Sequence, residues 1–226
     1  MPKTAEVRHH LALLISILLL FVIGPIVEEF RQGVVIMNAL AVLVLVTGLY
    51  ALHTRKSLFS TAIVLSLVSI GGTTLVYSTQ QEWAVVFAYI CIIFLIVYFT
   101  LTILAYVLRA GPVTMDKIFA AVCVYLLIGF AWTFAYALVD ALQPGSIALQ
   151  MQRTSDSYLL RQRALRYFSF MTLTTVGFGD IVPVSTSARA LAALEAVTGQ
   201  IYLTVLVARL VGLHIVHAHS KSTREN

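Results

Sequence analysis

Charged side chains are scarce in this sequence. Lys, Arg, Asp and Glu make up 11% of its 226 residues, whereas hydrophobic residues make up 60% and the mean hydropathy is +0.93. A soluble globular domain carries about 25% charged residues, so this composition argues against that class. The sequence predicts an integral membrane protein.

Cysteines and catalytic motifs are also scarce. The two cysteines, Cys91 and Cys123, fall inside long apolar runs, so we predict neither a disulfide framework nor a thiolate metal site and interpret both as packing residues. The sequence contains no His-Glu-x-x-His motif, no Gly-x-Ser-x-Gly motif and no paired intramembrane aspartates. These absences argue against a membrane enzyme, and we expect no cofactor.

Long apolar runs dominate the sequence instead. A bilayer core about 30 Å thick requires roughly 20 apolar residues in a helix, and six runs meet that requirement. We predict membrane spans over about 11–27, 34–52, 58–77, 83–108, 116–142 and 189–216. The connection between the last two spans is too long for an ordinary loop and contains a half-length apolar stretch, ALRYFSFMTLTTV, which predicts a re-entrant segment. The predicted class is an all-α membrane protein.

Lysine and arginine are unevenly distributed over the short connections. The two short outer loops carry only Arg31 if both termini are cytoplasmic. The inner side then holds Lys3, Arg8, Arg55, Lys56, Arg109, Lys117, Lys221 and Arg224. This bias predicts a multi-pass protein of the cell membrane with both termini in the cytoplasm. We attribute the net charge of +5 to this orientation and expect no nucleic-acid partner.

A polar stretch, TTVGFGD at residues 174–180, interrupts the re-entrant segment. Irregular backbone at membrane depth is stable only where it is buried in protein or lines a water-filled path. Gly177 and Gly179 allow conformations forbidden to other residues, and their alternation with Val176 and Phe178 would direct successive carbonyl groups toward one axis. A half-helix before the stretch would direct its negative C-terminal end toward the cavity below. Such a strip could replace the water around a cation.

The stretch TLTTVGFGD, with a proline three residues later, resembles the signature filter of tetrameric potassium channels. The likeness extends over the pore module of that family, about 112–217, with outer helix, pore helix, filter and inner helix. It implies one potassium-binding strip per chain and therefore a homotetramer, because a carbonyl ring around an ion takes four chains. The implied ion-binding residues are Thr175, Val176, Gly177, Phe178 and Gly179. The first four would supply the potassium-coordinating oxygens, and Gly179 with Asp180 would shape the outer mouth.

Two positions depart from the pattern of that family. Many such channels have tyrosine where Phe178 stands, and some have a glutamate at the position of Met171 that braces the aspartate of the filter. Tyr167 lies where the family often has a bracing tryptophan, and we predict a hydrogen bond from its hydroxyl to Asp180. Tyr167, Asp180 and Thr174 are thus the predicted filter supports.

The resemblance also divides the chain into three parts. Residues 1–110 are similar to the four-helix voltage-sensor bundle of six-span channels, residues 111–217 to the pore domain, and residues 218–226 form a short cytoplasmic tail without a regulatory domain. Voltage sensors carry arginines at every third position of the fourth span, but no charged residue occurs from Trp83 to Leu108. One charge contributes about 2.3 kcal/mol per 100 mV, so this helix cannot drive steep voltage gating.

The first part is therefore expected to be a scaffold beside the pore. The stretch RAGPVTMDK is the predicted linker between the two parts, and Gly111 and Pro112 mark the break.

The last span carries a glycine at the position of the family's hinge. This is Gly199, and at helical spacing it falls on one stripe with Leu203 and Val207. The stripe lines the cavity and an apolar gate, or it is ordinary membrane packing. Gln200 and Thr204 lie beside it and could contact hydrated ions.

Three further features of the last span have two interpretations each. Arg209 either extends to the cytoplasmic interface or pairs at the gate. Glu195 either braces the pore helix or pairs with an arginine of the outer loop. The histidines His214, His217 and His219 either anchor the helix at the interface or change gating on protonation.

The sequence thus predicts a potassium-selective channel that conducts passively, and the alternative is a non-selective monovalent cation channel. A coupled potassium transporter is disfavoured because such proteins resemble four pore modules in one chain. The partners expected are K⁺ as the permeant ion, the lipid bilayer and three further copies of the chain. The gating stimulus stays open among a soluble partner, a lipid, tension and pH. We expect Asp140 and Asp156 to offset the arginines of the outer loop, and we expect a prokaryotic source.

Overall fold

A computed structural model describes residues 8–27, 33–52, 56–79, 81–109, 111, 113–149 and 158–225. Lys3, Arg31, Arg55, Pro112 and Asp156, which the predictions above name, lie outside the described residues. The elements in chain order are α1 (Arg8–Val27), α2 (Gly33–Leu52), α3 (Lys56–Thr79), α4 (Glu82–Val107), α5 (Met115–Leu142), β1 (Ile147–Leu149), α6 (Tyr158–Leu173), β2 (Ile181–Pro183) and α7 (Thr186–Glu225).

Five helices are long and apolar enough to cross a membrane. They cover Val35–Leu52, Ser57–Val76, Glu82–Val107, Met115–Leu142 and Thr186–Arg209. The first four ranges match the second to the fifth predicted spans within one residue, and the last begins three residues before the sixth predicted span, 189–216, and ends seven residues before its end. By their length and composition, these helices are consistent with an all-α membrane protein. The first apolar helix, His9–Gly24, is shorter than that limit, so the first predicted span, over about 11–27, stays a prediction.

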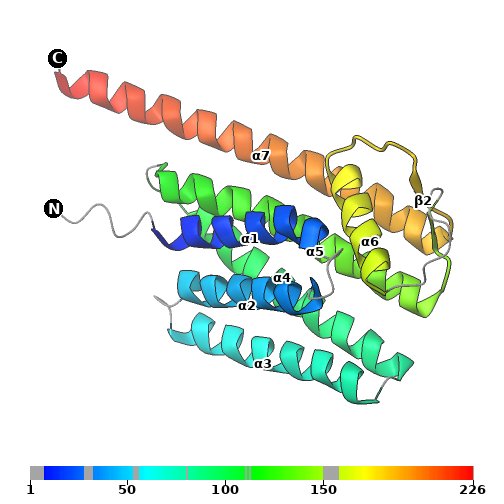
Figure 1. The fold of residues 1–226 in the computed structure, drawn as a ribbon. Helices are drawn as coiled ribbons and strands as arrows, with labels where there is room; N and C mark the ends of the chain where they lie inside the picture. The colour runs from blue at the N-terminus through cyan, green and yellow to red at the C-terminus, as the bar shows by residue number, and fades with distance from the viewer. Residues whose placement is uncertain are drawn as a thin grey trace.

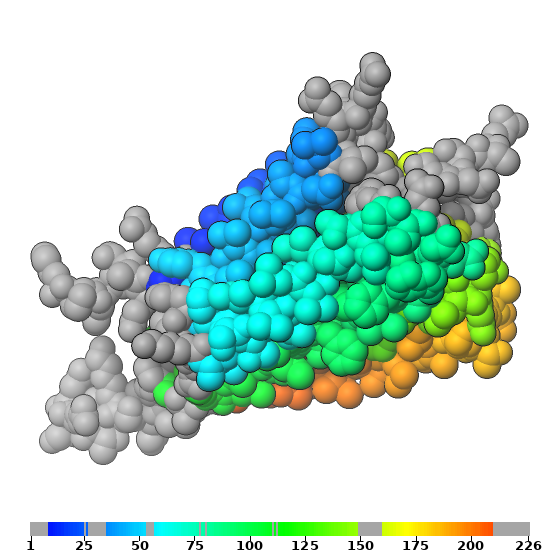
Figure 2. Space-filling view, turned by 90° about the horizontal axis from the view of Figure 1, so that it is seen from below, coloured from blue at the N-terminus to red at the C-terminus, as the bar shows by residue number. Residues whose placement is uncertain are grey.

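Helices α4 and α5 form the central pair of the structure, with α1 against α5 and with α2 and α3 completing the bundle (Figure 1). The main core lies between α1, α4 and α5 and includes Leu13, Ile17, Ile103 and Val124. Large apolar side chains point outward from α2, α3 and α4, whose surfaces lie beside one another in Figure 2. Such an apolar exterior suits a lipid environment.

A second core lies at the other end of α5. It includes Tyr136, Ile147, Leu165, Phe168 and Ala188, so α5, β1, α6 and α7 meet there. The 40 residues of α7 span roughly 60 Å, and the helix extends past α5 in Figure 1. The predicted tail at 218–226 is therefore a continuation of this helix through Glu225, because nothing in the sequence interrupts the helical pattern there.

The connection between the bundle and the last three helices is short. Helix α4 ends at Val107, and α5 begins at Met115. Thr114 caps the start of α5, because its side chain accepts a hydrogen bond from the Lys117 amide at 3.3 Å. Gly111 has a φ of 129°, which favours glycine. The break falls where the sequence predicts the linker.

A buried polar cluster joins the bundle to α5. Asp116 Oδ2 lies 2.8 Å from His10 Nδ1 and accepts a hydrogen bond from the Tyr106 hydroxyl at 2.7 Å. His10 also stacks on Tyr106, with 4.8 Å between the ring centroids. Because His10 is on α1 and Tyr106 is on α4, this one carboxyl holds three helices together.

We predict that Asp116→Ala lowers the thermal stability of the protein in detergent. The substitution leaves buried donors without an acceptor, at a cost on the order of 1–3 kcal/mol for each donor. Glu82→Gln is the matched control, because Glu82 is exposed at the start of α4 and its change should leave the melting temperature unaltered. Equal melting temperatures for the two variants would contradict this assignment.

Candidate functional site

The segment between α6 and β2 has an alternating backbone. Thr175, Gly177 and Gly179 have positive φ angles of 59°, 53° and 80°, and Thr175 is the one non-glycine residue with a positive φ in the described part of the chain. Val176 and Phe178 between them therefore have ordinary φ values. Alternation of this kind turns successive peptide groups the same way, which gathers N–H groups on one side and carbonyl groups on the other.

The amides at the start of this segment are engaged by the end of α6. The Val176 and Gly177 amides both donate to the Met171 carbonyl, at 2.9 and 3.2 Å. The Thr174 hydroxyl donates to the Phe170 carbonyl at 2.7 Å. Within the described residues, no hydrogen bond reaches a carbonyl oxygen of residues 174–179. These oxygens are available to bind another group.

Most of this segment is exposed in the single chain. The exposed fraction is 51% for Val176 and 71% for Phe178, which is high for apolar side chains beside a membrane-spanning helix. Among the described residues no group of three or more His, Cys, Asp or Glu side chains could hold a metal ion. Any cation at this segment would therefore bind to carbonyl and hydroxyl oxygens.

The inner end of the segment is in contact with α7. Gln200 Nε2 donates to the Thr175 hydroxyl at 3.3 Å. The pairing links the last helix to the first residue of the strip that the sequence predicts to bind ions. A contact of Gln200 with hydrated ions stays a prediction.

Asp180 closes the outer end of the segment. Its Oδ1 accepts a hydrogen bond from the Ile181 amide at 3.1 Å. Partial burial raises the pKa of the Tyr167 hydroxyl, and the Asp180 carboxylate raises that pKa further as a hydrogen-bond partner and a negative charge. Tyr167 and Asp180 therefore interact electrostatically, and the hydrogen bond between them stays a prediction.

Helix α7 approaches the end of α6 very closely at Gly199. A Cβ at this position would lie 2.2 Å from the Leu173 carbonyl oxygen, so any side chain would collide with backbone. This close approach explains the glycine without a hinge. It also divides the predicted stripe, because Gly199 is buried against α6 whereas Leu203 and Val207 are exposed. Lining of a cavity by Leu203 and Val207 stays a prediction.

Glu195 lies one turn before Gly199 and is fully buried. Its two carboxyl oxygens form hydrogen bonds with the Tyr136 hydroxyl and with the Ser169 hydroxyl, both at 2.6 Å. Glu195 therefore braces the short helix α6 through Ser169, which is the first of the two interpretations given above. It does not pair with an arginine among the described residues. The sequence offers no signal for these partners, because they come from two other helices.

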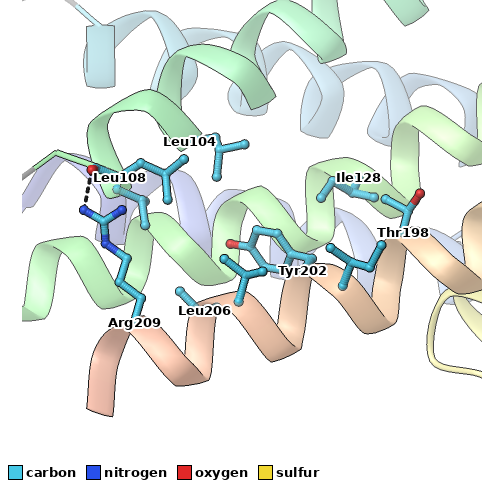
Figure 3. A pocket seen from close by; sticks show the side chains of 10 residues that line it. Leu104, Leu108, Ile128, Thr198, Tyr202, Leu206 and Arg209 are labelled. Atoms are coloured by element: carbon cyan, nitrogen blue, oxygen red, sulfur yellow. Dashed lines mark hydrogen bonds between the residues drawn. The ribbon is translucent and has the colours of Figure 1, made fainter. Parts of the chain in front are cut away.

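Arg209 connects α7 to the end of α4. Its guanidinium donates to the carbonyl oxygen of Leu108 (Figure 3) and also to that of Arg109, just past the end of α4, where carbonyl groups have no partner within the helix. An apolar cavity of about 340 Å³ lies beside it, lined by residues that include Leu104, Ile128, Tyr202 and Leu206. Arg209 therefore binds the connection between α4 and α5, which neither interpretation above predicts. The side chains of His214, His217 and His219 lie outside the described part of the chain.

A small sheet that the sequence does not predict lies in the connections between α5 and α7. Strands β1 and β2 pair antiparallel, with Ala148 opposite Val182. Beside them, Arg161 on α6 makes a two-pronged ion pair with Asp140 on α5, at 2.8 and 2.5 Å. Asp140 thus neutralises one arginine of the outer region, as expected. Strands of three residues carry too little pattern to be predicted.

Residues 164–213 match a family model described as Ion channel. The matched range covers most of α6, the irregular segment, β2 and the first two thirds of α7. The match indicates an ion channel. It points to a channel rather than an enzyme, and together with the five spanning helices it identifies a membrane channel. No curated protein and no solved structure matches the chain.

We predict that Gly199→Ala destabilises the channel. The added methyl group would force α7 away from the Leu173 carbonyl oxygen, and overpacking of this kind costs about 1–3 kcal/mol. Gly71→Ala is the control, because a Cβ there meets no atom within 4 Å and alanine favours a helix by about 1 kcal/mol. Thermal melting in detergent should show a lower midpoint for Gly199→Ala alone, and an unchanged midpoint would mean that the contact is not made.

Proposed function

We propose that four copies of this chain assemble around one axis and conduct potassium ions passively across the membrane. The observation that carries this proposal is the alternating backbone of residues 175–179, whose carbonyl oxygens have no partner among the described residues. Four such strips facing one axis would replace the hydration shell of an ion. The exposure of Val176 and Phe178 in the single chain supports an assembly that covers them.

Selectivity for potassium over sodium is part of the proposal. In the proposed tetramer, Thr175, Val176, Gly177 and Phe178 supply the oxygens, and Gly179 with Asp180 forms the outer mouth. The contacts of Thr174 and Tyr167 support the strip from behind. A complete run of four carbonyl-bearing residues favours a potassium filter over the wider, shorter strip of a non-selective channel.

In this proposal, α1 to α4 act as a scaffold in the cell membrane. Helix α4 carries no charge after Glu82, so it offers nothing for the membrane field to move. Steep voltage activation would contradict this part of the proposal. In the proposal both termini lie in the cytoplasm, α1 is a further membrane span, and an unidentified soluble protein or lipid is the regulator.

We predict that the purified protein in liposomes supports potassium flux and that Gly177→Ala abolishes it. Alanine at a φ of 53° is strained and would turn the peptide groups of the strip. Gly145→Ala is the matched control, because Gly145 also has a positive φ, 84°, but lies in the outer loop, with no neighbour within 4 Å of a Cβ. The Gly145→Ala protein should carry the same kind of backbone strain and still support potassium flux.

Reversal potentials in mixed potassium and sodium then decide selectivity. A reversal potential that follows the potassium gradient supports the proposal. Equal permeation of sodium would replace it with the non-selective cation channel, and flux that persists unchanged in Gly177→Ala would remove the strip from the conduction path.

A further inference from the structure

A carboxyl group lies in the interior where α5, α6 and α7 meet. Glu195 on α7, Tyr136 on α5 and Ser169 on α6 are each fully buried. Their polar atoms contact one another at 2.6 Å, so the cluster holds together the three helices that surround the predicted filter. Nothing in the proposed ion path uses this carboxyl group.

The number of protons available for the hydrogen bonds of this cluster indicates whether Glu195 is ionised or neutral. The Ser169 oxygen lies 2.6 Å from Glu195 Oε1 and 2.8 Å from the Gly129 carbonyl oxygen, which is itself an acceptor only. A serine hydroxyl has one proton, so it cannot donate to both. With an ionised Glu195, one of these two short contacts would join two acceptors without a proton between them.

A neutral Glu195 removes this conflict. Its own proton is donated from Oε1 to the Ser169 oxygen, the Ser169 proton is donated to the Gly129 carbonyl, and the Tyr136 proton is donated to Oε2. Every short contact then contains one proton. The neutral acid also avoids the large cost of an unpaired charge in a buried site.

The surroundings offer no counter-charge. The ion pairs between described residues join His10 to Asp116 and Arg161 to Asp140, and neither includes Glu195. The titratable groups of α5 that act on Glu195 are Tyr136 and Tyr125.

The charged group of α6 nearest in sequence to Ser169 is Arg166, whose guanidinium lies beside Gly24 on α1. On α7 itself, Arg189 donates to the Pro183 carbonyl and Arg209 donates to the Leu108 and Arg109 carbonyls. These cations are thus directed to other elements.

We propose that Glu195 is a neutral carboxylic acid that positions the pore helix α6 behind the filter. Ser169 lies one turn before Leu173, the last residue of α6, and Glu195 lies one turn before Gly199, which packs on the Leu173 carbonyl. Glu195 and Gly199 therefore both fix the final turn of α6. The amides at the start of the predicted filter are hydrogen-bonded to this same turn. Ionisation of Glu195 would take the Ser169 proton from the Gly129 carbonyl and so break the hydrogen bond that ties this end of α6 to α5.

The inference rests on the proposed function for its effect on conduction but not for the protonation state. Infrared difference spectroscopy of wild type against Glu195→Gln tests that state directly. We expect the carbonyl stretch of a neutral carboxylic acid in wild type at neutral pH and its loss in the variant. Asp140→Asn is the control, because its ion-paired carboxylate should contribute no such band. Absence of the band from wild type would overturn the proposal whether or not the protein conducts.

Potassium flux in liposomes then tests the positioning role. Glutamine keeps a neutral acceptor and donor, so Glu195→Gln should conduct like wild type, whereas Glu195→Ala should lose conduction. Wild-type flux should fall reversibly at alkaline pH, and flux through Glu195→Gln should not. Loss of flux in a stably folded Glu195→Gln protein, or the same alkaline loss in both, would overturn the role.

A second variant keeps the test valid if the glutamine protein does not fold. Ser169→Ala removes the acceptor of the Glu195 proton, so the acid band should move to higher frequency in that variant. An unmoved band would overturn the assigned hydrogen bond.

Discussion

The contact between α7 and the end of α6 is the constraint on which the rest of the structure depends. Only a residue without a side chain fits at position 199, because the Leu173 carbonyl oxygen occupies the space of a Cβ. That approach fixes the last turn of α6, and the amides of Val176 and Gly177 bind that same turn through the Met171 carbonyl. The direction of the segment after α6, residues 174–180, therefore follows from how two helices pack.

Polar contacts on both sides of this packing stabilise the arrangement. On the side of the α4–α5 connection, Asp116 ties α1 and α4 to α5, and Arg209 ties α7 to the end of α4. Toward the outer loop, the Arg161 and Asp140 pair holds α6 to α5. Movement of α7 would thus be transmitted to the connection between the bundle and the pore helices.

Sequence reasoning predicts the parts of this fold that depend on local pattern. Apolar runs locate five spans, Gly111 marks the break after α4, and the alternation of Gly177 and Gly179 matches the observed positive φ angles. Side-chain partners that come from distant helices cannot be predicted in this way. Nothing near Asp116 in the chain points to His10, and nothing near Glu195 points to Tyr136 or Ser169.

The glycine at 199 shows the same limit. Its position in the sequence predicts a hinge, which stays a prediction, but the sequence gives no sign of the carbonyl group of Leu173, 26 residues earlier, which tertiary packing places against it. The sequence does not predict strands β1 and β2, because three residues are too few to show a period. Their pairing also depends on where the irregular segment before β2 ends.

The central claim is that residues 175–178 bind potassium ions on a fourfold axis. Anomalous X-ray scattering from crystals of the assembled protein grown in rubidium, a heavier cation close to potassium in size, tests it most directly. The account predicts a row of rubidium peaks on the axis between the carbonyl oxygens of Thr175, Val176, Gly177 and Phe178. A tetramer without rubidium at this strip, or an assembly in which the strip faces no symmetry axis, would contradict it.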